Sequence, residues 1–247
     1  MDPEVVAALR SARQVAVLTG AGVSAESGIP TFRDALTGLW ADYRPEDLAT
    51  PEGFRRNPEL VWRWYRGRRL AVAQALPNAG HRALAVMERL VPRLTLITQN
   101  VDGLHARAGS TDVVELHGNI GRVKCFGCAM VASSFEDTDR LPRCSACGDM
   151  LRPDVVWFGE LLPTSALTRA EAAATGCDMF LSIGTSNLVQ PAASLPWIAA
   201  ERRALVVVIN LNDDGQTTGE RVRFLPGRSG ELLPRLVAAT WPDAPPV

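Results

Sequence analysis

Short apolar runs alternate with amphipathic segments along most of the chain. The apolar runs are rich in β-branched residues and predict buried strands over residues 15–18, 94–98, 113–117, 179–184, 205–211 and 221–225. Apolar positions at helical spacing predict helices over residues 4–13, 79–91 and 164–175. Strands that alternate with helices are typical of a parallel sheet covered on both faces, so we expect an α/β fold.

Two stretches interrupt this alternation. Residues 35–76 show no convincing strand pattern and are rich in arginine and tryptophan, and residues 124–151 are short, cysteine-bearing and rich in turn formers. We interpret both as insertions into the sheet domain that pack together as a second lobe.

Composition narrows the class of protein. Hydrophobic residues make up 47% of the 247 residues and charged residues 21%, which excludes global disorder. The net charge of −1 argues against direct binding of nucleic acid through charge. The longest aliphatic run, residues 205–209, is too short to cross a bilayer, and the first residues lack the pattern of a secretory signal. We therefore expect a cytoplasmic protein without a membrane partner. Of the 26 basic residues, Lys124 alone is a lysine.

A glycine turn follows the first predicted strand. Residues 20–25, Gly-Ala-Gly-Val-Ser-Ala, match the pattern G-x-G-x-x-G/A, in which glycines let the backbone approach a pyrophosphate. An ordinary tight turn between strand and helix is the alternative. An ordinary dehydrogenase is disfavoured, because the acidic residue expected about 20 positions further on, after a second strand, is missing. Asp42 has the spacing but no strand before it.

Four cysteines form two tight pairs. Cys125 and Cys128 are separated from Cys144 and Cys147 by 15 residues, a spacing that predicts a four-thiolate zinc site. Four sulfur ligands leave no open position for water, so this zinc would be structural. Two redox dithiols and a nucleic-acid-binding zinc ribbon are the alternatives.

Polar groups gather where four predicted strands end. His117 closes one strand, and the other strands run into residues 99–102, 184–186 and 210–212. The carboxyl ends of parallel strands are where open α/β sheets bind ligands, so we expect these groups to share one site. The other two histidines, His81 and His105, are interpreted as helix residues.

Seven features follow one another along the chain: residues 20–33, 99–105 and 115–118, the four cysteines, and residues 152–160, 184–186 and 210–212. In sequence and order they resemble the sirtuins, the family of NAD-dependent protein-lysine deacylases. The resemblance implies a Rossmann-like NAD-binding domain over residues 1–34, 77–123 and 152–247. It also implies a small lobe, formed by a helical insertion over residues 35–76 and a zinc-binding module over residues 124–151, with the active site between the two. It also implies NAD as a consumed co-substrate, one structural zinc, and acyl-lysine peptides or proteins as partners.

The resemblance further implies a reaction. The amide oxygen of acyl-lysine attacks the anomeric carbon of the NAD ribose as nicotinamide leaves. His117 then acts as general base on a ribose hydroxyl, and the products are free lysine and 2′-O-acyl-ADP-ribose. An imidazole, with a pKa of about 6.5, suits that role. A mono-ADP-ribosyltransferase using the same pocket is the alternative function, and a non-catalytic zinc-ribbon binding module is a second one.

The same matching assigns contacts residue by residue. NAD would touch Gly20, Ala21, Gly22, Ala25, Phe32, Arg33, Gln99, Asn100, Val101, Asp102, Gly184, Thr185, Ser186, Asn210, Leu211, Asn212 and Ser229. The acylated peptide would pair as an added strand with Val156, Phe158, Gly159 and Glu160. Gln190 stands where the family commonly has tyrosine, a departure at one substrate contact.

The arginine-rich segment 61–69 bears on the acyl group. Tyr65 and Arg68 are neighbours on one helical face, and a guanidinium beside a phenol suits a carboxylate. This pair resembles that of the sirtuins that remove succinyl, malonyl or glutaryl groups. A solvated basic face is the alternative, and nucleic-acid binding through interleaved tryptophan and arginine is another.

Overall fold

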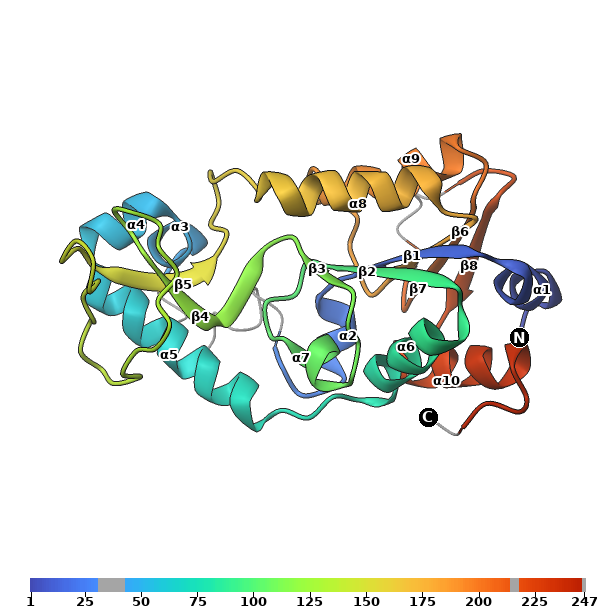
Figure 1. Cartoon of the computed structure of the whole chain (residues 1–247), viewed down its shortest axis with the longest axis horizontal. Helices are drawn as coiled ribbons and strands as arrows, with labels where there is room; N and C mark the ends of the chain where they lie inside the picture. Colours follow the sequence, from blue (N-terminus) through green and yellow to red (C-terminus); the bar gives the residue numbers. More distant parts are fainter. Residues whose placement is uncertain (31–42, 214–217, 246–247) are drawn as a thin grey trace.

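The computed structural model describes residues 1–30, 43–213 and 218–245, and its centre is a six-stranded parallel sheet (Figure 1). The strands are β1 (Gln14–Thr19), β2 (Arg93–Thr98), β3 (Val113–Glu115), β6 (Met179–Ile183), β7 (Leu205–Asn210) and β8 (Val222–Pro226). Their order is β3-β2-β1-β6-β7-β8, so the direction of winding reverses between β1 and β6. In open α/β sheets, ligands bind at the carboxyl ends of the strands beside such a reversal.

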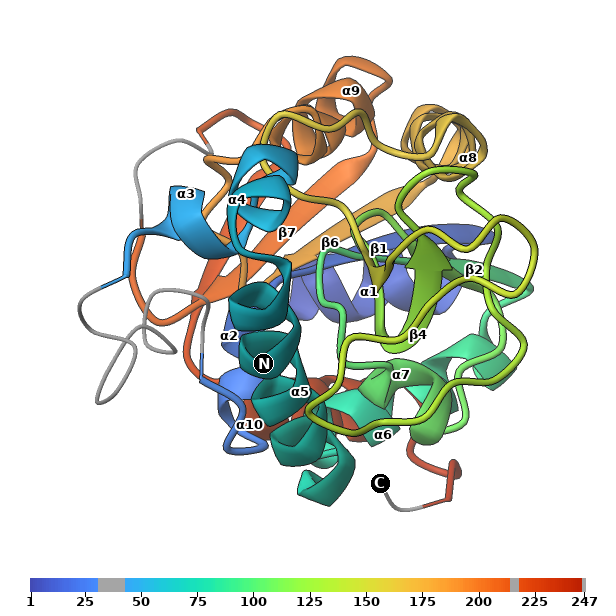
Figure 2. The same cartoon turned by 90° about the vertical axis from the view of Figure 1, so that its left-hand side faces the viewer.

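Helices cover both faces of this sheet, which confirms the predicted α/β fold. On one face lie α1 (Pro3–Ser11), α6 (Ala79–Leu90) and α10 (Ser229–Thr240), and on the other α8 (Thr164–Gly176) and α9 (Leu195–Glu201) (Figures 1 and 2). Successive strand residues point to opposite faces. Val15 and Val17 therefore join the first core, and Ala16 and Leu18 join the second.

One predicted strand is shorter than expected. The strand predicted over residues 113–117 ends at Glu115, and His117 lies in a turn that leads into β4 (Gly118–Cys125). Gly118 has a φ of 77°, a conformation that favours glycine and turns the chain away from the main sheet. A Cβ there would lie 2.2 Å from the carbonyl oxygen of Asp154, so the turn also needs the space that glycine leaves.

A second, two-stranded sheet lies beside the main one. It pairs β4 antiparallel with β5 (Leu151–Val155), and the sequence pattern did not predict it. Against it pack α3 (Pro45–Leu48), α4 (Pro51–Arg56) and α5 (Pro58–Gln74), seen at the left of Figure 1. The side chains of Thr50 and Asn57 cap α4 and α5 by accepting backbone N–H groups of the first turn. Three short elements complete the described part of the chain: α2 (Ala21–Ala25), α7 (Leu104–Arg107) and η2 (Ala192–Ser194).

Across the described ranges, no helix combines the length and the hydropathy that crossing a membrane would require.

Candidate active site

Two glycine-containing loops meet where the winding of the sheet reverses. Gly20 follows β1, and its N–H donates to the carbonyl of Ile183 at 3.0 Å. The N–H of Gly22 donates to the carbonyl of Gly184 at 2.8 Å. A Cβ on Gly22 would lie 2.8 Å from the Cα of Gly184, so a side chain there would push the loops apart. Glycine is thus required here by the close approach of the two loops, and the predicted approach to a pyrophosphate stays a prediction.

A polar cluster lies beside this turn. Asn100, just after β2, donates its Nδ2 hydrogens to the carbonyl of Gly20 at 2.9 Å and to Ser24 Oγ at 3.0 Å. Ser24 Oγ in turn donates to Asp102 Oδ2 at 2.7 Å, and the Leu104 N–H donates to Asp102 Oδ1 at 2.8 Å. Both carboxylate oxygens of this buried aspartate are held. The cluster is therefore a fixed set of amide, hydroxyl and carboxylate groups.

Residues at the carboxyl ends of three strands, β2, β6 and β7, meet at Thr185. Gln99 Nε2 donates to Thr185 Oγ1 at 2.9 Å, and Asn210 Nδ2 donates to the Thr185 carbonyl at 3.0 Å. Ser229 is buried at the start of α10, where its hydroxyl donates to Glu26. Of the other predicted NAD contacts, Val101 is half-buried, and the rest are exposed to solvent: Ala21, Ala25, Ser186, Leu211 and Asn212. Phe32 and Arg33 lie outside the described residues.

His117 faces this cluster with a defined tautomer. Its Nδ1 lies 2.9 Å from the backbone oxygen of Gln99. A carbonyl oxygen can only accept, so Nδ1 carries the hydrogen and Nε2 of the neutral ring keeps its lone pair. Burial lowers the pKa of His117 below its usual range, and the bond to Gln99 opposes part of that effect. At neutral pH the ring is therefore an unprotonated base.

The other two histidines are buried structural groups. His105 lies in α7, its Nε2 is 2.9 Å from Thr19 Oγ1, and burial lowers its pKa to about 3. His81 lies in the first turn of α6, and burial lowers its pKa to about 4. Their rings are 4.7 Å apart between centroids. Both are helix residues, as predicted, and both are neutral at pH 7.

Tyr65 and Arg68 lie on α5. Trp157 donates its indole N–H to Tyr65 Oη at 2.9 Å. Burial raises the pKa of Tyr65 to about 12, so the phenol stays protonated and can donate. The Arg68 guanidinium lies 4.9 Å from the ring centroid of Trp64. Burial lowers the pKa of Arg68, and the negative charge of Asp102 opposes part of that effect, so this arginine lies within electrostatic reach of the polar cluster.

Residues 156–160 are anchored to the turn that carries His117. The Val156 N–H donates to the His117 carbonyl at 2.9 Å, and the Phe158 N–H donates to the Ala49 carbonyl at 3.0 Å. The Glu160 carboxylate pairs with Arg152 and accepts the Trp157 N–H, so its side chain serves the fold of this segment. Gly159 has a φ of 86°, and Phe158 is 55% exposed. Pairing of a peptide with this segment stays a prediction.

The four cysteines of the two pairs converge. Their sulfur atoms all lie within 4.8 Å of one another, with Cys125 and Cys147 3.4 Å apart and Cys128 and Cys144 3.8 Å apart. A tetrahedral site with Zn–S bonds of about 2.3 Å has sulfurs about 3.8 Å apart. The donor set and its spacing thus fit zinc, whereas the fifth cysteine, Cys177, is buried beside α8.

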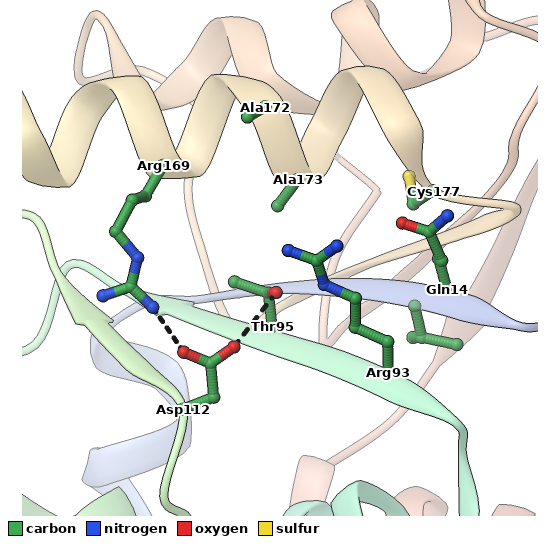
Figure 3. Close-up of a pocket in the computed structure, with 9 residues that line it drawn as sticks. Gln14, Arg93, Thr95, Asp112, Arg169, Ala172, Ala173 and Cys177 are labelled. Carbon is green, nitrogen blue, oxygen red and sulfur yellow. Dashed lines mark hydrogen bonds and ion pairs between the residues drawn. The ribbon is translucent and has the colours of Figure 1, made fainter.

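A separate cavity of about 190 Å³ lies at the amino-terminal ends of β1 and β2, beneath α8 (Figure 3). Asp112 accepts there from Thr95 and from Arg169, and the Arg93 guanidinium extends toward α8 near Ala173. Its place at the opposite ends of the strands separates it from the glycine turn and from His117.

Comparison with known proteins identifies the family. Residues 20–191 match the model of the Sir2 family. The chain belongs to the Sir2 family. Among curated proteins, this Sir2 chain is 50% identical over 247 residues to NAD-dependent protein deacylase 1 of Pseudomonas aeruginosa, covering 96% of this chain and 98% of that protein.

Solved structures of other Sir2 proteins share the fold over nearly the whole length. A Sir2 homolog in complex with NAD superposes with a TM-score of 0.91 and 44% identity, covering 97% of this chain and 94% of that one. A mutant Sir2 homologue in complex with 2′-O-acetyl ADP ribose superposes with a TM-score of 0.89 and 45% identity, covering 97% and 96%.

Two residues of the site were not among the predicted ones. Ser24 bonds to both Asn100 and Asp102, and Trp157 orients Tyr65. Both stand inside motifs that the sequence singled out, residues 20–33 and 152–160. Position within a motif was the available signal, but which side chain turns inward depends on the packing of distant segments.

Proposed function

We propose that this Sir2 protein is an NAD-dependent protein-lysine deacylase whose general base is His117. The observation that carries the proposal is the fixed tautomer of His117, which presents Nε2 as an acceptor beside the polar strand ends. Membership of the family, curated relatives named as NAD-dependent protein deacylases and the likeness to a solved NAD complex support it.

The chain's residues have distinct tasks in this proposal. The loops of Gly20, Gly22 and Thr185 bind the dinucleotide, whose pyrophosphate needs close backbone approach. Asn100 and Asp102 hold the nicotinamide end. NAD supplies the electrophilic ribose carbon and the leaving nicotinamide. His117 accepts a proton from a ribose hydroxyl at Nε2, while the Gln99 carbonyl stabilises the resulting positive ring at Nδ1.

The proposal also divides the chain into two parts. Residues 35–76 and 124–151 form the small lobe, and the remaining residues form the Rossmann-like domain. Packing of Trp62 from α5 with Cys125 and Cys144 in one apolar cluster supports the pairing of the two insertions. The substrate cleft then lies between the parts, lined by residues 156–160. The chain is expected to act on proteins in the cytoplasm. Its balanced charge disfavours binding of nucleic acid.

Acidic acyl groups are the preferred substrates in this proposal. Tyr65 offers a protonated hydroxyl and Arg68 offers a guanidinium, one helical turn apart on α5. A guanidinium can hold both oxygens of a carboxylate, which suits succinyl and malonyl chains. Acetyl-lysine lacks that carboxylate and would bind through the remaining contacts alone.

Nicotinamide release with matched acetyl-lysine and succinyl-lysine peptides tests the proposal. We expect NAD-dependent release with both, a lower KM for the succinyl peptide, and stoichiometric 2′-O-acyl-ADP-ribose. Release of nicotinamide with ADP-ribose covalently attached to protein would instead favour the mono-ADP-ribosyltransferase. If neither peptide stimulates the release of nicotinamide under any condition, the proposal is wrong.

A further inference from the structure

Helix α5 packs against the cysteine-bearing segment through Trp62, which shares an apolar cluster with Cys125 and Cys144, and it also carries the proposed acyl-binding pair, Tyr65 and Arg68. Trp62, Arg66 and Arg69 recur at helical spacing and meet residues 135–139. Trp62 donates its indole N–H to the Thr138 carbonyl at 2.8 Å, and Arg66 Nε donates to the Asp137 carbonyl at 2.9 Å.

The strongest contact on that face is an ion pair with two hydrogen bonds. Arg69 Nη2 donates to Asp137 Oδ1 at 2.7 Å, and its Nε donates to Oδ2 at 3.3 Å. The guanidinium also stacks 4.4 Å from the Trp62 ring and 5.4 Å from the Phe135 ring. Arg69 is 6% exposed, and within the described part of the chain its Nη1 has no hydrogen-bond partner. A buried charge of this kind depends on its carboxylate.

The acyl-binding residues are direct chain neighbours of these clamped positions. Tyr65 precedes Arg66, and Arg68 precedes Arg69. Because α5 is one continuous helix of 17 residues, a rotation or a slide of the helix at Arg69 would displace the Tyr65 hydroxyl and the Arg68 guanidinium together. His117 and the polar cluster lie on other elements, at the ends of β2 and β6 and in the β3–β4 turn.

We propose that Asp137 is a positioning residue for acyl-chain selection, acting through Arg69 to fix α5 and its Tyr65–Arg68 pair. The inference rests on the proposed recognition of acidic acyl groups by that pair. It assigns to the cysteine-bearing module a role in choosing the substrate: the module holds the loop that carries Asp137, and the loop holds the helix.

Asp137→Asn tests this role, because it removes the charge while keeping the shape. Displacing a substrate-binding group can lower the efficiency of the reaction with that substrate by roughly 10- to 100-fold. We therefore expect the KM for the succinyl-lysine peptide to rise by about tenfold. The kcat and the KM for the acetyl-lysine peptide should stay within about twofold, because His117 and the polar cluster are untouched. Asp137→Glu should recover much of the loss.

Asp139→Asn is the matched control. Asp139 lies on the same loop, pairs with Arg66 and is 73% exposed, so the same change there should leave both substrates unaffected. Equal effects of Asp137→Asn on both peptides would overturn the proposal, as would no effect on either. If Asp137→Asn does not fold, Arg69→Lys is measured for the same split between substrates, with zinc content and melting temperature as checks on folding.

The variant Arg68→Met distinguishes a failure of this inference from a failure of the proposed acyl recognition on which it rests. If Arg68→Met leaves the succinyl KM unchanged, recognition of the acyl carboxylate itself is wrong. If Arg68→Met raises that KM and Asp137→Asn does not, the positioning role alone is wrong.

Discussion

The imidazole ring of His117 is held by the backbone of Gln99, because Nδ1 donates its hydrogen to the Gln99 carbonyl at 2.9 Å. The same Gln99 donates its side-chain amide to Thr185, so one residue after β2 fixes the ring and also reaches the loop after β6. The orientation of the base is therefore coupled to the loops assigned to NAD.

His117→Ala should remove turnover and leave NAD binding intact. A positioned general base contributes roughly 10²–10⁴-fold, so kcat should fall by at least that range for both peptides. Calorimetry should give an NAD affinity within a few-fold of the parent protein, since the glycine turn and the polar cluster are unchanged. Near-normal kcat in the variant would take His117 out of the reaction.

Arg68→Met should depress desuccinylation selectively. Hydrogen bonds to a charged group contribute about 1.5–3 kcal/mol each, so kcat/KM for the succinyl peptide should fall roughly 10- to 100-fold. The acetyl substrate has no carboxylate to lose, so its kcat/KM should change far less. Steady-state kinetics on the two peptides measures the ratio.

Arg63→Met provides the control for that ratio. Arg63 is an exposed arginine on the same helix, with its Nε 3.4 Å from the Glu59 carbonyl of the preceding turn. It should not change the succinyl-to-acetyl preference. Parallel losses on both substrates in Arg68→Met would mean that this residue supports the fold instead of the acyl group.

Zinc removal should unfold the β4–β5 region and abolish activity. The cysteine sulfurs join the ends of two strands that pack against Trp62, and structural zinc contributes directly to folding. We expect one zinc per chain by metal analysis, lost in Cys144→Ser but kept in Cys177→Ser, which changes the remote cysteine. Active, folded protein without zinc would contradict the thiolate site.

Acid should destabilise the protein through its histidines. His81 and His105 have folded-state pKa values of about 4 and about 3, well below the usual value of about 6.5. Between the folded-state and the usual pKa values, these histidines are protonated in the unfolded chain and neutral in the folded chain, so acid favours unfolding. The free energy of unfolding should begin to fall as the pH drops below about 6.5, by at most about 1.4 kcal/mol per pH unit for each histidine.

Urea titrations at pH 7, 6 and 5 measure this slope. His105→Gln keeps an amide that can donate to Thr19 but removes the titrating ring, so its slope should be shallower by nearly one proton. An unchanged slope would show that His105 is protonated in the folded protein.

The elements predicted best from the sequence are the strands that are buried on both faces. Strands β2 and β6 lie within a residue of their predicted bounds, because strands buried on both faces read as unbroken apolar runs. The β4–β5 pair was missed, since it carries Arg122, Lys124 and Arg152, and its two strands are joined by the cysteine-bearing segment. Its pairing depends on packing against α5, which no local pattern encodes.

The site follows the same division. The glycine turn and the strand-end groups could be located from sequence, because backbone approach and topology dictate where they stand. The contacts that orient them could not. The bond from Trp157 to Tyr65 spans 92 positions, and the pairing of Arg69 with Asp137 spans 68. Such contacts depend on how separate segments meet in space.

The solitary lysine, Lys124, has a practical consequence for work with this protein. Its ammonium group lies 3.4 Å from an Asp154 carboxylate oxygen, and its side chain is 24% exposed. Reagents that derivatise primary amines can therefore modify few places on the chain. Assays that mix the protein with reactive acyl donors should report on the added peptide with little background from the catalyst itself.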